Sequence, residues 1–128
     1  MSEQQVPGSL CWVELLTHDL DTAKKFYSDL IGWKTVDQDI AKRPYTVLKP
    51  PGHNVSVGGM MDMEDSQYKG VPPHWMPYIL VTDIDAKAAK CIDLGGKVLH
   101  PPTDIPNIGR YCIIQDPTGA AIALFQAP

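Results

Sequence analysis

The chain has 128 residues and a mass of 14.1 kDa, which is the size of one ordinary domain. Its 44% hydrophobic and 20% charged residues are typical of a globular protein, and a net charge of −4 without a Lys/Arg cluster argues against nucleic acid or an anionic membrane as partner. No apolar run approaches the ~18 residues that span a membrane, and the first residues lack a signal-peptide pattern. We therefore expect a cytoplasmic protein whose partner is a small molecule or another protein.

The first half of the chain predicts one strand, one helix and three more strands. After a lead-in at 1–8, the aromatic and branched residues at 10–16 predict a buried strand. Asp19 fits a helix N-cap and Gly32 fits the left-handed residue that ends the helix. The next strands are predicted at 33–37, 45–48 and 54–60, with a polar turn around 39–43 between the first two.

The second half predicts the same order of elements. Residues 63–73 are polar and end in two prolines, so we expect a linker there. A strand follows at 75–81, and Asp83 caps a helix that ends at Gly95 and Gly96. The last three strands are predicted at 98–100, interrupted by PPTDIP, at 110–115 and at 121–126.

The two halves repeat one another at an offset of half the chain. When the two halves are aligned at this offset, Asp19 matches Asp83 and Gly32 matches Gly96. Several positions within the two predicted helices match as well. A β-α-β-β-β module of this size cannot bury its sheet alone. We therefore predict an α+β fold of two modules, 9–62 and 74–126, whose sheets together enclose a cleft.

Three segments resemble the vicinal oxygen chelate superfamily, which includes glyoxalase I, bleomycin-resistance proteins and extradiol dioxygenases. They are DLDTAKKFYSDLIGW, VTDIDAKAAKCIDLGGKV and DPTGAAIALFQ. The stretches PGSLCWVEL, VGGMM and PPHWMPYILV make the chain look most like a small glyoxalase-like group that includes mycobacterial antigens named as hydroxylases. The resemblance covers residues 9–126 and implies the tandem βαβββ fold.

The resemblance also implies where metal ligands would stand, and this chain departs from that pattern. In metal-using members one ligand comes from the first strand and one from the last strand of each module, commonly His or Glu. Carried over by spacing, these positions are Trp12, Ser56, Met76 and Ala123. Because none of these side chains offers an imidazole or a carboxylate, we expect no metal and no other cofactor.

The same face of the strands then predicts an apolar, aromatic site for a small molecule. Glu14 is its one obvious acid and is expected to act with Tyr78 as a general acid/base or to bind a cationic ligand. Alternatively, Glu14 hydrogen-bonds a tyrosine or Arg110 and only orients the sheet, or does not face inward. The remaining candidate ligand-binding residues, including the four degenerate positions, are Trp12, Tyr45, Ser56, Met76, Arg110, Tyr111, Ala123 and Phe125.

Three functions fit these features. The first is a metal-free protein that binds a small, largely hydrophobic organic molecule, as bleomycin-resistance relatives do. The second is a metal-independent lyase- or isomerase-like enzyme that uses Glu14. The third is an interaction module whose cleft is filled by its own side chains. We expect a homodimer, because paired modules of this superfamily often assemble symmetrically and edge strands favour pairing.

Overall fold

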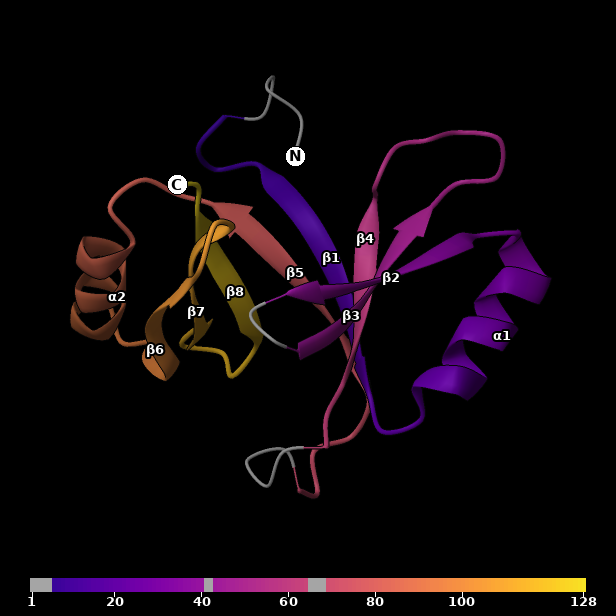
Figure 1. Ribbon diagram of the computed structural model, residues 1–128. Coiled ribbons are helices and arrows are strands. Elements are labelled where there is room, and N and C mark those ends of the chain that lie inside the picture. Colours follow the sequence, from indigo (N-terminus) through magenta and orange to yellow (C-terminus); the bar gives the residue numbers. More distant parts are fainter. Residues whose placement is uncertain (1–5, 41–42, 65–68) are drawn as a thin grey trace. The chain divides into compact units, whose positions relative to one another are not determined.

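The computed structural model describes residues 6–40, 43–64 and 69–128 (Figure 1). Its elements follow the order strand, helix and three strands, twice over. The first set is β1 (Leu10–Thr17), α1 (Leu20–Ile31), β2 (Lys34–Ile40), β3 (Arg43–Lys49) and β4 (Gly58–Asp62). The second set is β5 (His74–Leu80), α2 (Ile84–Asp93), β6 (Lys97–Ile105), β7 (Gly109–Gln115) and β8 (Ala121–Gln126). The predicted α+β fold with tandem βαβββ modules is confirmed.

The contacts within the chain divide it into two compact units. One unit is residues 12–75, and the other is residues 76–128 together with the segment that ends at Cys11. Backbone hydrogen bonds join Gly8 and Ser9 to Leu80, which holds the start of the chain on the second unit. The predicted lead-in at 1–8 and the predicted linker at 63–73 lie partly outside the described residues, so the predicted domain limits stay a prediction.

In the first unit, a four-stranded sheet is covered on one face by α1. The strand order is β2-β3-β4-β1, with β1 and β4 parallel and the other neighbours antiparallel. Three buried side chains on the helix side, Leu15, Leu48 and Met60, form the core. Aromatic residues pack against it, and Tyr27 of α1 makes ring contacts with Trp33 and Trp75.

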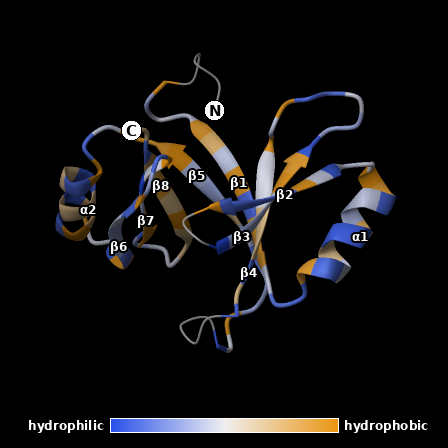
Figure 2. Cartoon of the chain, in the orientation of Figure 1, coloured by the Kyte–Doolittle hydropathy of each residue, from blue (hydrophilic) through white to orange (hydrophobic). Residues whose placement is uncertain are grey.

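Local signals explain where α1 begins and ends. The Asp19 carboxylate accepts a hydrogen bond from the Thr22 amide, and Gly32 ends the helix with a φ of 87°. The apolar side chains of α1 are only partly covered by the sheet, since Phe26 and Leu30 are 55% and 66% exposed. Figure 2 shows hydrophobic and hydrophilic residues alternating along this helix.

The second unit repeats the arrangement with α2. Its strand order is β5-β8-β7-β6, with β5 and β8 parallel and the other pairs antiparallel. Asp83 caps α2 by accepting from the Ala86 amide. The core between helix and sheet consists of Ile84, Ala88, Cys112 and Leu124.

Three predicted boundaries in the chain are wrong. β4 begins at Gly58 and not at residue 54, because the preceding segment forms a loop. In this loop the Asn54 side chain accepts a hydrogen bond from Lys49, and the Val57 amide donates to the Leu48 carbonyl. β6 continues through the PPTDIP stretch as far as Ile105, since a register shift between His100 and Thr103 accommodates the two prolines there. Part of the predicted polar turn at 39–43 is strand, because Asp39 pairs with Pro44 and Ile40 with Arg43, whereas residues 41–42 lie outside the described residues.

Candidate functional site

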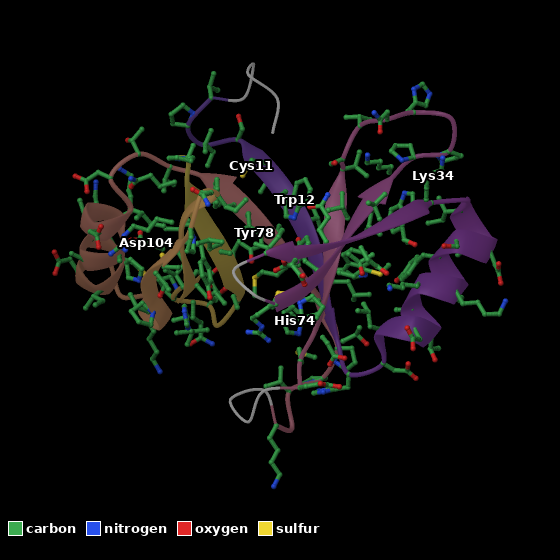
Figure 3. The ribbon with its side chains drawn as sticks, in the orientation of Figure 1. Cys11, Trp12, Lys34, His74, Tyr78 and Asp104 are labelled. Atoms are coloured by element: carbon green, nitrogen blue, oxygen red, sulfur yellow. The ribbon has the colours of Figure 1, made fainter. Side chains whose placement is uncertain are left out.

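Each sheet has a face opposite its helix, which we call the distal face. On β1, Leu15 packs toward α1, so the alternation of a strand places Trp12 and Glu14 on the distal face of the first sheet. Figure 3 labels Trp12 on this strand. Tyr45 of β3 joins them there, because its hydroxyl contacts both residues. The predicted common face of Trp12 and Glu14 is therefore present within this unit.

Trp12, Tyr45 and Glu14 form a hydrogen-bonded trio. The Trp12 Nε1–H donates to the Tyr45 hydroxyl oxygen at 2.8 Å, and the Tyr45 hydroxyl is also hydrogen-bonded to Glu14. Since an ionised carboxylate only accepts, the tyrosine proton is directed to Glu14. Glu14 is 5% exposed and Tyr45 is 9% exposed, so the trio is a buried polar network.

The environment keeps Tyr45 in its neutral, proton-donating form. Burial contributes most to raising the pKa of the Tyr45 hydroxyl far above its ordinary value, and the negative charge of Glu14 adds to it. The hydrogen bond to Glu14 raises the pKa further, whereas the bond from Trp12 lowers it. The trio therefore presents a chain of donors in which Trp12 donates to Tyr45 and Tyr45 donates to Glu14.

Gly59 on β4 makes room for this arrangement. It is the register partner of both Glu14 on β1 and Val47 on β3. A Cβ atom at this position would overlap the Tyr45 hydroxyl and the ring carbon that bears it. The tyrosine hydroxyl thus occupies the space where any other residue at position 59 would place its side chain.

The strand register also corrects the predicted position Ser56. Glu14 pairs with Gly59 in the first unit as Tyr78 pairs with Ala123 in the second, and both pairs are related by the offset between the modules. The counterpart of Ala123 is therefore Gly59. Ser56 is exposed and lies in the loop before β4, because this loop is longer than the corresponding turn before β8.

The residues at the corrected positions do not suit a divalent metal ion. Trp12, Gly59, Met76 and Ala123 supply an indole, a hydrogen atom, a thioether and a methyl group. Such a set lacks the imidazole and carboxylate donors that zinc, nickel or iron sites require. Among the described residues, no group of three or more His, Cys, Asp or Glu side chains is placed to hold a metal ion.

The distal face of the second sheet carries the other predicted residues. Tyr78, Ala123, Ile113 and His100 are successive register partners across its four strands and form one row. Phe125 and Tyr111 are partners in the neighbouring row. Met76 precedes Tyr78 by two residues and is 5% exposed, so the chemical character of this face is mainly apolar and aromatic.

Arg110 does not belong to the distal face, and its guanidinium pairs with two aspartates and not with Glu14. Its predicted role as a ligand-binding residue stays a prediction. It alternates with Tyr111 along β7 and so lies on the helix side. Its guanidinium binds Asp85 of α2 at 2.8 Å and Asp104 of β6 at 3.0 Å. These ion pairs explain why the pKa of Asp85 is lowered, with the hydrogen bond from Arg110 as the largest cause.

Sequence reasoning missed Gly59 and His100. Gly59 could have been found by applying the module offset to Ala123, because that offset also relates the two capping aspartates. His100 lies half-buried inside β6. No sequence signal marks this position, because the register shifts on either side of it depend on pairing with β7.

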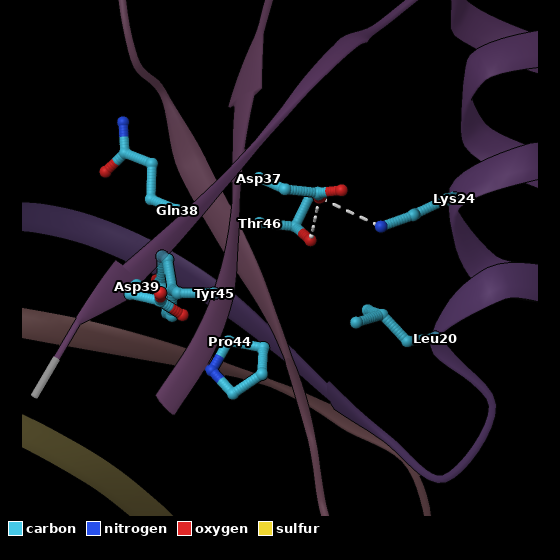
Figure 4. A pocket seen from close by; sticks show the side chains of 8 residues that line it. All are labelled: Leu20, Lys24, Asp37, Gln38, Asp39, Pro44, Tyr45 and Thr46. Carbon is cyan, nitrogen blue, oxygen red and sulfur yellow. Dashed lines mark hydrogen bonds and ion pairs between the residues drawn. The ribbon is translucent and has the colours of Figure 1, made fainter. Parts of the chain in front are cut away.

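A separate pocket of about 320 Å³ lies between α1 and the strands β2 and β3 (Figure 4). Lys24 reaches Asp37 at 2.9 Å, and the Thr46 hydroxyl donates to the same carboxylate oxygen at 3.0 Å. These contacts largely satisfy the charged groups of the pocket. Its full lining is Leu20, Lys24, Asp37, Gln38, Asp39, Pro44, Tyr45 and Thr46.

The tandem βαβββ fold agrees with comparisons of the whole chain with known proteins. The chain belongs to the Glyoxalase/Bleomycin resistance protein/Dioxygenase superfamily, whose sequence profile it matches over residues 9–124. The predicted family is therefore confirmed. Within the family, the chain is 38% identical over 120 residues to "Putative glyoxylase CFP32" of Mycobacterium bovis and Mycobacterium tuberculosis. It is 34% identical over 121 residues to the anthracycline biosynthesis protein DauV of a Streptomyces species.

The chain spans about half the length of these curated relatives. The match to CFP32 covers 94% of this chain and 46% of the relative, and the match to DauV covers 94% and 42%. None of the helices in the described part of the chain is long and apolar enough to cross a membrane.

Solved structures with the same fold include methylmalonyl-CoA epimerases. The enzyme from Mycobacterium tuberculosis has a TM-score of 0.65 at 20% identity, over 100% of this chain and 93% of that chain. An epimerase in complex with methylmalonyl-CoA and ammonium has a TM-score of 0.66 at 19% identity, over 95% of this chain and 96% of that chain. At such identities the likeness shows the fold alone.

Proposed function

We propose that this protein binds a small, largely hydrophobic organic molecule without a metal ion, and that the Trp12–Tyr45–Glu14 trio is the polar anchor of the site. The observation that carries the proposal is the buried Glu14 carboxylate, which is held by a tyrosine whose hydroxyl fills the side-chain position of Gly59. A buried, hydrogen-bonded carboxylate on an otherwise apolar face is the kind of group that orients a ligand.

The relatives support a small-molecule ligand. One is named as a glyoxylase and another as an anthracycline biosynthesis protein, and a protein of the same fold was solved in complex with methylmalonyl-CoA. The residues at the family's ligand positions support binding without a metal, because Trp12 and Gly59 replace donors with an indole and a hydrogen atom.

The second candidate function is a metal-independent lyase- or isomerase-like enzyme in which Glu14 is the general acid/base. The hydrogen bond between Glu14 and Tyr45 favours it, because such a bond can hold a carboxylate in position to take up and return a proton. The fold relationship to epimerases is consistent with this chemistry. Tyr78 stays the predicted partner of Glu14, on the register position of the second sheet that corresponds to Glu14.

Native mass spectrometry tests the first proposal on protein purified without added metal. We expect an excess mass in the native spectrum that disappears on denaturation and that corresponds to an organic compound. The variants Glu14→Gln and Tyr45→Phe should retain the fold and lose most of this excess, whereas Arg110→Gln serves as a matched control on the other face. Stoichiometric nickel, zinc or iron that survives dialysis against a chelator would contradict the proposal.

The same compound, once identified, separates binding from catalysis. Incubation with unmodified protein and with Glu14→Gln should leave it unchanged if the protein only binds it. Turnover that is lost in Glu14→Gln, while the compound is still bound, would favour the enzyme.

A further inference from the structure

His100 and Tyr111 form a second polar centre, on the distal face of the second sheet. The His100 Nε2 atom lies 3.0 Å from the Tyr111 hydroxyl and 3.2 Å from the Thr103 hydroxyl. The two rings are nearly parallel, with an interplanar angle of 15° and centroids 5.1 Å apart. Register shifts in β6 on both sides of His100 let this residue pair with Ile113 while Thr103 pairs with Tyr111.

The hydrogen bonds determine which nitrogen of His100 carries the proton. The Thr103 hydroxyl donates its only hydrogen to the Pro101 carbonyl at 2.8 Å. Its oxygen then accepts from His100, and the contacts to Thr103 and Tyr111 are both hydrogen bonds only when Nε2 carries the proton. The Nε2–H is then shared with the Tyr111 hydroxyl oxygen at 3.0 Å.

In the neutral ring the remaining nitrogen, Nδ1, then carries a lone pair. Within residues 6–40, 43–64 and 69–128, no hydrogen bond to this atom is formed. An imidazole held by one nitrogen and open at the other is the arrangement in which histidine accepts a proton or a hydrogen bond. The trio on the first sheet makes no use of the His100 Nδ1 atom, so a function of this atom would be separate from that of the trio.

The neighbours of His100 indicate the chemistry that it would accept. Its row on the distal face contains Ile113, Ala123 and Tyr78, and the next row adds Phe125 beside Tyr111. These side chains favour an aromatic or hydrophobic body, and the Nδ1 lone pair favours a weakly acidic hydroxyl group. A phenol or an enol combines the two.

We propose that His100 is a ligand-binding residue that accepts a hydrogen bond at Nδ1 from a phenolic or enolic hydroxyl, with Thr103 and Tyr111 as residues that position its ring. The inference deepens the proposed function, since it assumes that the protein binds a small organic molecule. It names a second contact residue and the class of the hydroxyl-bearing ligand.

The first test is the tautomer of His100 in the unmodified protein. Long-range ¹H–¹⁵N correlation spectra at about pH 8, where neutral imidazole predominates in model peptides, distinguish the two nitrogens. We expect a protonated Nε2 and an unprotonated Nδ1, with the signals assigned by their loss in His100→Phe. Thr103→Val should shift this equilibrium toward a mixture of tautomers. A protonated Nδ1 in the unmodified protein would overturn the proposal.

The second test uses two probes of nearly the same shape, 2-naphthol and 2-methoxynaphthalene. Only the first has a hydroxyl hydrogen, so the unmodified protein should bind it roughly five- to tenfold more tightly, as expected for one hydrogen bond. His100→Phe keeps an aromatic ring at the position and should abolish the difference. His53→Phe, in the exposed loop before β4, is the matched control and should retain it.

Every result of the second test bears on the proposal. Equal affinity for the two probes, or a preference that persists in His100→Phe, would refute the role of Nδ1. If neither probe binds while the protein still purifies with an organic compound, this inference fails and the proposed function stands. If neither probe binds and no compound is retained, both fail.

Discussion

Replacing Gly59 by alanine tests whether the Tyr45 hydroxyl occupies the side-chain position on β4. Gly59 does not have a positive φ, so its backbone conformation suits alanine. The new methyl group would nevertheless overlap the Tyr45 hydroxyl, and the ring would have to move away. Its movement separates the hydroxyl from both Trp12 and Glu14.

The expected cost follows from the two hydrogen bonds. The bond from Trp12 to Tyr45 joins neutral groups and is worth about 1 kcal/mol, whereas the bond from Tyr45 to the Glu14 carboxylate is worth about 1.5–3 kcal/mol. Glu14 is 5% exposed, so water replaces the lost donor poorly. We expect the free energy of unfolding to fall by about 3 kcal/mol, which lowers the Tm by roughly 10 °C for a chain of this length.

Urea unfolding of four proteins measures the effect as a double-mutant cycle. The unmodified protein, Gly59→Ala, Tyr45→Ala and the double variant are compared. In the Tyr45→Ala background the overlap is absent, so Gly59→Ala should cost less than about 1 kcal/mol. Equal costs of Gly59→Ala in both backgrounds would refute the reasoning, because the penalty would then not arise from Tyr45.

Three further predictions concern pH, the surface ion pairs and assembly. Burial and Glu14 raise the pKa of the Tyr45 hydroxyl in the folded state, so the unfolded state loses this proton first as the pH rises. The free energy of unfolding should therefore decrease above about pH 10. Urea titrations at alkaline pH should show a smaller decrease for Tyr45→Phe. The pKa of Asp85 is lowered by Arg110, so the pair stabilises above the ordinary pKa of an aspartate and the effect is lost as pH falls; Arg110→Gln should reduce that acid sensitivity in thermal melts, and an unchanged profile would contradict it. Light scattering should give twice the chain mass, since edge strands favour symmetric pairing of two copies; a single-chain mass at all concentrations would refute the dimer.

The two proposed polar centres make separable contributions to binding. The trio on the first sheet contains an acid, Glu14, and the pair on the second sheet contains a base, His100. Their register positions differ, since Glu14 corresponds to Tyr78 while His100 corresponds to Val36 at the outer strand of the first sheet. The variants Glu14→Gln and His100→Phe therefore test the two proposals separately.

Local features of the sequence determined the order of elements and the limits of α1. Asp19 and Asp83 cap the helices and Gly32 ends the first one, because capping involves only atoms within one helical turn. The repetition of these signals at one offset was enough to predict two βαβββ modules, and the sequence motifs were enough to predict the family.

Only the tertiary structure decided which residues share the distal faces. The start of β4 depends on its pairing with β1 and β3, and a shift of strand register exchanges the two faces. For this reason Ser56 was placed on a strand that begins two residues later, and Gly59 was overlooked. The Tyr45 hydroxyl packs against Gly59, and the Arg110 guanidinium binds Asp85. Both contacts join residues that are distant in sequence, so no local pattern predicts either of them.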